Sequence, residues 1–148
     1  MKIKLLILNL ILITVSACGQ NRNNKQFSQS EINLKENTEI KKIAKKLENG
    51  MISFMEYGET EYTKNDVKKC MTLIDNYLVE ISKSDSKKTG LQSVKKVILE
   101  LNKLNESCGS QLIETDQREK IADIIILSGY LKGYNKRNED ITEEWREW

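Results

Sequence analysis

Four long segments of this chain repeat apolar residues at helical spacing, and none of them contains proline. The stripes cover residues 40–55, 67–81, 91–104 and 121–127. This spacing places the apolar side chains on one face of an α-helix. Proline, which would break a helix interior, is absent from all 148 residues. The pattern therefore predicts an all-α fold, a compact bundle of four main helices whose short connections favour antiparallel neighbours.

Turn and cap residues indicate where these helices begin and end. Gly50 lies inside the first stripe, but the stripe keeps its phase across this residue. We therefore expect one continuous helix there, ending at Gly58. Thr63 is followed three positions later by Asp66, and Thr89 by Gln92. This spacing is a form of capping box and predicts that the second and third helices start at these threonines. Gly109 is expected to close the third helix.

The fourth helix is expected to lie at the centre of the bundle. It opens at Thr115 and Asp116, where an acid suits the positive end of the helix dipole. Residues 121–127 are apolar nearly all round, and such a helix must be covered by its neighbours. Gly129 and Gly133 belong to a strip of small residues, which predicts the close approach of a neighbouring segment.

The C-terminal end predicts a short fifth helix, because Ile141, Trp145 and Trp148 recur at a spacing that forms one apolar face. Trp145, Arg146 and Trp148 are also candidates for contact with a partner, since tryptophan and arginine are enriched at interface hot spots. The alternative is that both indoles dock on the bundle and hold the C-terminal residues in place.

A second candidate contact surface lies between the first and second helices. Here Tyr57 and Tyr62 are interspersed with Glu56, Glu59 and Glu61. Exposed tyrosines flanked by acids suit protein recognition, and a solvated loop is the alternative. Clustered carboxylates can bind a hard cation, but the regular ligand spacing of a calcium loop is missing. We therefore expect neither a metal nor another cofactor.

The composition argues against most enzyme classes. The chain has no histidine, the commonest general base and metal ligand. Asp123, an acid within the apolar run of the fourth helix, is either a carboxylate with a raised pKa in a cleft or a surface acid paired with a lysine or arginine. A hydrolase that depends on two carboxylates is the remaining enzymatic alternative. A small-ligand carrier would need an apolar cavity, which the fourth helix should fill.

Cys70 and Cys108 are candidates for a disulfide. In an antiparallel pair of helices, Cys70 lies opposite a position about one turn before Cys108. The chain after Gly109 could bring the two Cα atoms within the ~4.4–6.8 Å that a disulfide requires. Two unpaired core thiols are the alternative. We expect no catalytic thiolate, because the spacing is not that of a CxxC motif and no histidine could activate it.

The first seventeen residues are organised like a bacterial export signal. Lys2 and Lys4 precede the apolar run Leu5–Val15, which is too short for a bilayer span of ~20 residues but suits a signal peptide. Residues 15–18 are then Val-Ser-Ala-Cys. This tetrapeptide resembles the lipobox of bacterial lipoproteins, in which an aliphatic residue and two small residues precede an invariant cysteine.

The resemblance implies cleavage before Cys18 and transfer of a diacylglyceryl group to its thiol. Residues 1–17 would be the signal peptide, 18–33 the lipidated cysteine with a polar tether, and 34–148 a single helical domain. Two or three acyl chains give persistent attachment, whereas one chain holds only marginally. We therefore expect a location in the cell envelope, facing the periplasm. Gly19 stands where some lipoproteins carry an aspartate that retains them in the inner membrane, so the resemblance slightly favours the outer membrane.

Removal of the signal peptide also changes the charge argument. It takes away two of the 24 basic residues and none of the 22 acidic ones, so the mature chain carries 22 of each. No basic excess remains to bind nucleic acid. We therefore expect a non-enzymatic lipoprotein whose helical domain binds a protein partner, in envelope maintenance or assembly. The alternative is an immunity-type lipoprotein that neutralises a toxin acting in the periplasm.

Overall fold

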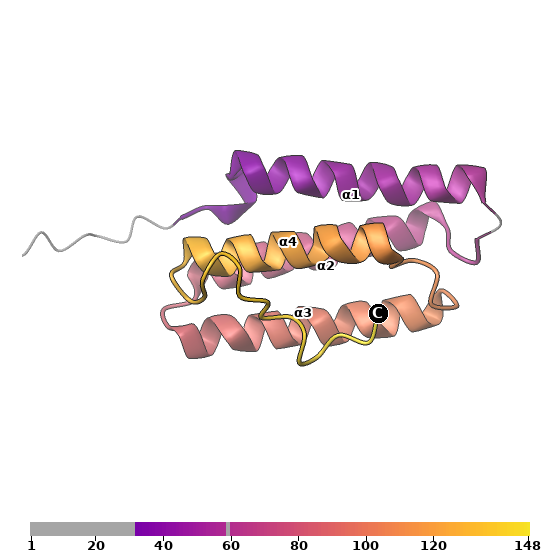
Figure 1. Ribbon diagram of the computed structural model, residues 1–148. Coiled ribbons are helices and arrows are strands. Elements are labelled where there is room, and N and C mark those ends of the chain that lie inside the picture. Colours follow the sequence, from indigo (N-terminus) through magenta and orange to yellow (C-terminus); the bar gives the residue numbers. More distant parts are fainter. Residues whose placement is uncertain (1–31, 59) are drawn as a thin grey trace, which may run out of the picture.

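The computed structural model describes residues 32–58 and 60–148, and the predicted all-α fold is confirmed there (Figure 1). These residues form helices and turns, with no strand among them. The predicted signal peptide, Cys18 and nearly all of the predicted tether lie outside the described residues. No helix in the described part of the chain is both long enough and apolar enough to cross a membrane.

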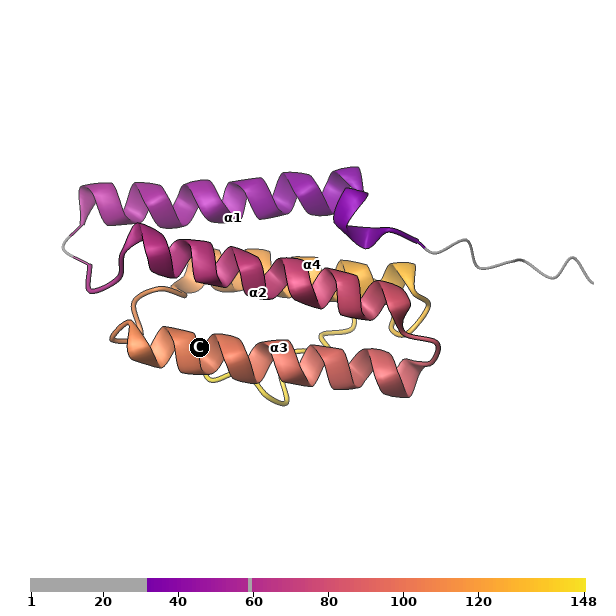
Figure 2. The same cartoon turned by 180° about the vertical axis from the view of Figure 1, so that it is seen from behind.

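The domain consists of four antiparallel helices in up-down-up-down order, preceded by a single 3-10 turn (Figures 1 and 2). Successive helices are joined by short connections, as expected for antiparallel neighbours. α1 packs mainly on α4, and α2 packs mainly on α3. The elements are η1 (Leu34–Glu36), α1 (Thr38–Tyr57), α2 (Lys64–Lys83), α3 (Lys87–Ser107) and α4 (Thr115–Leu131).

Two ends of the bundle are distinguished below. The near end is where the chain enters at Leu34 and where α2 connects to α3 (Figure 1). The far end is where α1 connects to α2 and α3 connects to α4. Leu34 is fully buried, and its backbone N–H donates to Oγ of Ser82 at 3.2 Å. The start of the domain is therefore fixed against the near end of α2.

The predicted N-terminal capping box is confirmed for α2, whereas the predicted start of α3 is wrong. At α2, Thr63 and Asp66 form the predicted capping box, and hydrogen bonds from Lys69 and Thr63 lower the pKa of Asp66 to about 2. At α3, Ser86 and Thr89 form the box, so the helix starts at Lys87. Thr89 therefore stands at the third helical position of α3 and is not its N-cap.

Two glycines end helices in the left-handed conformation. Gly109 follows α3 with a φ of 62° and Gly133 follows α4 with a φ of 73°. After α4, the N–H of Gly133 donates to Tyr130 O and that of Tyr134 donates to Gly129 O. This is the Schellman arrangement, which satisfies the last carbonyl groups of a helix. The prediction that Gly109 closes α3 is confirmed, and α1 runs without interruption through Gly50.

The core is aliphatic, as the sequence predicted, and all four helices contribute to it. α2 packs against every other element, whereas α4 packs mainly on α1, so the expected central position of α4 is not confirmed. Seven successive positions of this helix, 121–127, contribute only one exposed residue, Asp123, and Ile126 is half-buried. Tyr77 of α2 is buried against α4, where its hydroxyl hydrogen-bonds to Oγ of Ser128 at 2.7 Å. The largest fully buried side chains of the domain include Tyr77, Leu34, Ile40, Leu47, Met51, Ile74, Leu78, Ile81, Ile98, Leu101, Leu112 and Ile121.

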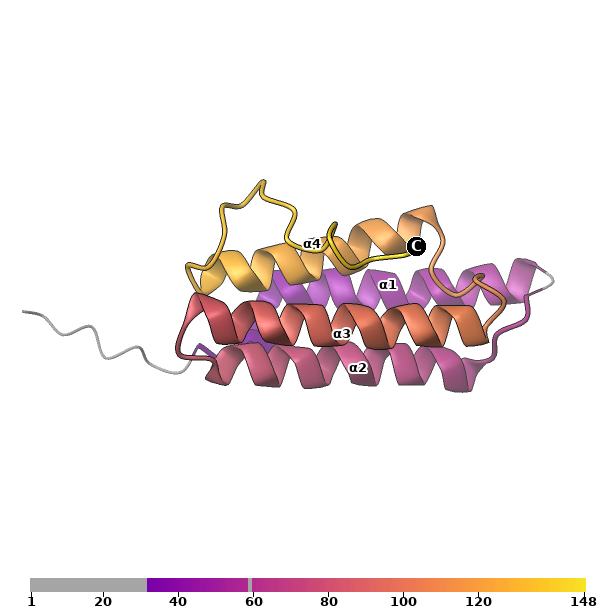
Figure 3. The same ribbon diagram turned by 90° about the horizontal axis from the view of Figure 1, so that it is seen from below.

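The C-terminal segment, residues 132–148, differs from the prediction. It forms no helix, although every one of its residues is described. It runs instead along α4 and α3 as turns and extended chain (Figure 3). Asn102 of α3 determines this course: its Nδ2 donates to Trp145 O at 2.8 Å and its Oδ1 accepts from the Glu147 N–H at 3.3 Å. The second of these bonds engages the Glu147 N–H, which in a terminal helix would donate to the carbonyl of Glu143.

Two glycines allow this segment to lie close to the helices. A Cβ atom on Gly129 would overlap the side-chain oxygen of Asn135, and a Cβ on Gly90 would lie 2.5 Å from Cδ2 of Tyr134. Tyr134 cannot easily withdraw, because its hydroxyl donates to Ser84 O at 2.9 Å. The close approach predicted at Gly129 is therefore confirmed and is made by the C-terminal segment, and Gly90 allows a second one. The close approach predicted at Gly133 is wrong, because among the described residues no atom beyond its chain neighbours lies within 4 Å of a Cβ built there.

Gly90→Ala tests this packing against a matched control. We expect it to lower the free energy of unfolding by about 1–3 kcal/mol, the usual range for overpacking, because the new methyl group meets the Tyr134 ring. Gly50→Ala, also inside a helix, has only ordinary contacts and should raise stability by up to about 1 kcal/mol. Urea denaturation measures both. Equal effects of the two substitutions would contradict the packing described for Tyr134.

Candidate functional site

Of the two tyrosines predicted for partner contact, only Tyr57 is available at the surface. Tyr57 is 92% exposed at the last position of α1, whereas Tyr62 is 3% exposed. The Tyr62 hydroxyl donates to Met51 O at 2.8 Å. Burial raises the pKa of Tyr62, and the nearby Cys108 and Glu114 raise it further. Tyr62 is thus a core residue at the far end, and its assignment as a contact residue is corrected by its burial.

The tryptophan cluster takes the second of its two predicted roles. Trp145 and Trp148 are half-buried and pack on the core, and Nζ of Lys95 lies 5.9 Å from the centroid of the Trp145 ring. Arg146 is turned inward within its own segment, with Nη1 3.0 Å from Oδ2 of Asp140. Because these groups are engaged by the domain itself, the cluster holds the C-terminal segment in place.

A shallow, open cleft lies beside Tyr57 at the far end. It has a volume of about 440 Å³ and lies between the last two turns of α1 and the first turn of α4. We call it the α1–α4 cleft. Phe54, which the sequence placed on the apolar stripe, is 45% exposed beside it. The lining residues are Gly50, Ser53, Phe54, Tyr57, Glu114, Thr115, Asp116 and Gln117.

Gly50 sets how closely the two helices approach at the cleft. A Cβ atom on this residue would lie 3.5 Å from Oδ2 of Asp116 and 3.9 Å from Nε2 of Gln117. The first turn of α4 therefore rests beside a position of α1 that has no side chain. Because Gly50 has only a hydrogen atom where other residues have a Cβ, the inner end of the cleft stays open.

The cleft is acidic. Glu114 and Asp116 line it, and none of its lining residues is basic. Oδ1 of Asp116 is paired with Nζ of Lys120 one turn further along α4, while Oδ2 faces Gly50. The last turn of α1 adds Glu56 and contains no basic residue, although the carbonyl end of a helix favours cations. The electrostatic potential at this surface therefore favours a positively charged group.

Gln117 is an unusual member of the lining. It is only 4% exposed, yet among the described residues its Oε1 has no hydrogen-bond partner. A buried polar atom without a partner costs about 1–3 kcal/mol, so such atoms are few in folded proteins. Nothing in the sequence signals this state, because Gln117 becomes buried only when the first turn of α4 packs on α1.

The cleft lies at the opposite end of the domain from the point where the chain enters. Leu34 is at the near end, and α1 then runs for 20 residues to Tyr57 at the far end (Figure 1). A helix of that length spans about 30 Å. A domain held through residues that precede Leu34 therefore presents the cleft at its opposite tip.

The two core cysteines also lie toward the far end. Cys70 and Cys108 are both buried, and their thiols are free in this structure. Burial raises the pKa of the Cys70 thiol to about 12, with a contribution from the nearby Cys108. Burial also raises the pKa of Cys108. Such thiols are weak nucleophiles at neutral pH. The disulfide between them stays a prediction.

Asp123 has the placement of a surface acid. It is exposed on α4, in a small hollow of about 140 Å³ that Glu39 and Arg137 also line. Arg137 forms its ion pair with Glu39 there, with Nη2 and Oε1 2.7 Å apart. In the described part of the chain, no three acidic or cysteine side chains are grouped so that they could hold a metal ion.

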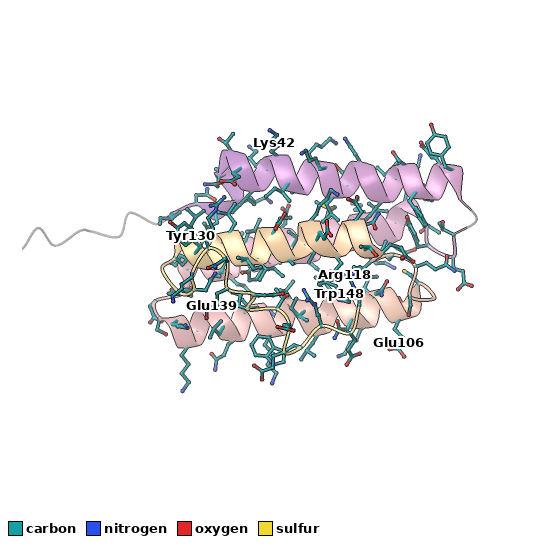
Figure 4. The ribbon with its side chains drawn as sticks, in the orientation of Figure 1. Lys42, Glu106, Arg118, Tyr130, Glu139 and Trp148 are labelled. Atoms are coloured by element: carbon teal, nitrogen blue, oxygen red, sulfur yellow. The ribbon has the colours of Figure 1, made fainter. Side chains whose placement is uncertain are left out.

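Comparison of the chain with protein-family models, with curated proteins and with solved structures found no match. The interpretation of the α1–α4 cleft therefore depends on its own geometry. That geometry combines two exposed aromatic rings, two carboxylates and a buried amide at one tip of the bundle. Figure 4 shows how many other side chains extend from the surface: Lys42 and Tyr130 lie away from this tip, whereas Glu106 lies at the same end of the bundle, on α3.

Gln117→Met should stabilise the protein if its amide is as poorly satisfied as the structure indicates. We expect the free energy of unfolding to rise by about 1 kcal/mol, because methionine has a similar shape and leaves no buried acceptor without a donor. Gln111→Met is the matched control and should destabilise by a similar amount, since Oε1 of Gln111 accepts from the Glu61 N–H at 3.0 Å. Thermal denaturation of both variants measures this. A loss of stability in Gln117→Met would contradict the interpretation.

Proposed function

We propose that this protein is a lipid-anchored lipoprotein of the bacterial cell envelope that acts through protein contacts at the far end of its helical domain. The lipobox-like sequence at Val15–Cys18 supports the anchor. The exposed α1–α4 cleft supports the contact. Its position at the opposite end of the domain from Leu34, where the chain enters, is the observation on which the proposal mainly depends.

The length of chain between Cys18 and Leu34 suits this arrangement. Its sixteen residues could reach about 50 Å if fully extended, so the domain can stand clear of the lipid headgroups. Attachment through the near end then leaves the far end directed away from the membrane. A surface for recognition is most useful at the end that a partner in the periplasm can reach.

A contact surface accounts for the cleft better than a catalytic site does. The chain has no histidine, and one of the two carboxylates of the cleft, Asp116, is engaged by Lys120. Exposed aromatic rings next to charged groups are typical of interface hot spots. We therefore propose a non-enzymatic role, in envelope maintenance or assembly. The immunity-type role is the alternative, and it uses the same surface.

Site-specific photo-crosslinking in cells tests the proposal. A benzoylphenylalanine that replaces Tyr57 should give a discrete crosslink to an envelope protein. The same group in place of Lys42, which is exposed on the near half of α1, is the control and should give at most about a tenth of that product. The crosslink at position 57 should also disappear in a Cys18→Ala background, because the unanchored domain is no longer held beside its partner.

The identity of the crosslinked protein separates the two roles. An envelope-assembly protein supports a part in maintenance or assembly, whereas a secreted toxin supports the immunity-type role. Equal crosslinking from positions 57 and 42, or none from either, would contradict a contact surface at the far end.

A further inference from the structure

We propose that the α1–α4 cleft receives an arginine side chain presented by the protein partner. The inference rests on the proposed function for the existence of that partner and adds the chemistry by which the partner is recognised. Three independent features of the cleft support it: its charge, its aromatic rim and its unsatisfied amide.

The charge of the cleft selects a cation. Glu114 and Asp116 stand at the start of α4, where the free N–H groups of a first helical turn would otherwise attract an anion. In the described part of the chain, no side chain hydrogen-bonds these N–H groups, but the negative charge of the two carboxylates offsets the positive end of the helix and repels an incoming anion. Lys120 bonds to Oδ1 and to the backbone carbonyl of Asp116. The carboxylate of Glu114 and the Oδ2 atom of Asp116 remain to bind a positively charged group.

The aromatic rim favours a flat cation. Phe54 and Tyr57 lie one turn apart on the last part of α1, both exposed and both lining the cleft. A cation over the face of an aromatic ring gains about 0.5–1 kcal/mol at an exposed site. The planar guanidinium group of arginine stacks on such rings more readily than the ammonium group of lysine.

The amide of Gln117 favours a ligand with several donors. Its Oε1 lacks a hydrogen-bond partner among the described residues, while its Nε2 is the atom that lies beside Gly50 in the cleft. A half-turn about the terminal side-chain bond exchanges the two atoms and brings the oxygen to the cleft. A guanidinium carries five N–H donors in a fixed fork. It can therefore donate to this oxygen and to a carboxylate at the same time. The small size of Gly50 keeps the inner end open for the head group.

Nα-acetyl-arginine amide is a suitable probe, because it carries the guanidinium group and no carboxylate. The protein is the processed form extracted from membranes in detergent and labelled with ¹⁵N. We expect millimolar binding, the range of a single side chain, seen as shifts of the Gln117 side-chain amide and of the backbone N–H groups at the start of α4. Nα-acetyl-citrulline amide, which has nearly the same shape without the charge, should bind at least about tenfold more weakly.

Substitutions in the cleft should weaken binding of the arginine probe, and matched substitutions elsewhere should not. Glu114→Gln should weaken it about threefold, as expected for one exposed opposite charge. Gln117→Met should weaken it about tenfold, because a hydrogen bond to a charged donor is lost. Glu106→Gln, on the exposed face of α3, and Tyr130→Leu, near the end of α4, should leave it unchanged. Glu114 is exposed, so its variant tests the cleft even if Gln117→Met is altered in fold.

The outcomes separate this inference from the proposed function. Absence of probe-induced shifts, equal binding of the citrulline compound, or equal effects of Glu114→Gln and Glu106→Gln would overturn the arginine site, even if position 57 crosslinks to a partner. Selective binding of the arginine probe without any crosslink from position 57 would support the chemistry of the cleft and count against the proposed function.

Discussion

The need to cover the apolar residues of α4 shapes much of this domain. Residues 121–127 are buried except for the exposed Asp123 and the half-buried Ile126, and α1 and α2 cover only part of this apolar surface. The C-terminal segment covers more, and it approaches closely because Gly129 has no side chain at the point where Asn135 lies. On the other side of the segment, Gly90 admits the ring of Tyr134 and Asn102 binds the backbone at Trp145. The two tryptophans therefore pack on the core and help to cover it.

This arrangement makes the two ends of the bundle different. The near end is closed, because Leu34 is buried against α2 and Tyr134 is bonded to the connection between α2 and α3. At the far end, Tyr62 fills the core below the α1–α2 connection, while Phe54 and Tyr57 of α1 remain at the surface. The first turn of α4 rests on Gly50, and Gln117 is buried there without a partner for its oxygen. Among the described residues, three buried polar atoms have no hydrogen-bond partner: Gln117 Oε1 at this open, acidic end, and Asn135 Oδ1 and Trp148 Nε1 in the C-terminal segment. Of these three, only the Gln117 side chain lines the α1–α4 cleft.

The helices could be predicted from local pattern, whereas the site could not. The spacing of the apolar residues and the capping box at Thr63 predicted the extent of α1 and α2. These signals are local, because each involves residues within one or two helical turns of one another. The predicted start of α3 is three residues too late, because Ser86 is the N-cap and forms the capping box with Thr89. The predicted terminal helix is wrong: residues 132–148 form turns and extended chain, and their Glu147 N–H donates to Asn102, some forty residues away in sequence. The α1–α4 cleft depends on Gly50 meeting Asp116, a contact between positions that are far apart in sequence.

The central claim is that the domain is held to a membrane through Cys18, so that its near end is anchored and its far end is free. The intact mass of the native protein, extracted from membranes in detergent, tests this most directly. The account predicts a chain that begins at Cys18 and carries two or three acyl chains on that residue. A chain that begins at Met1 and has no fatty adduct would contradict it.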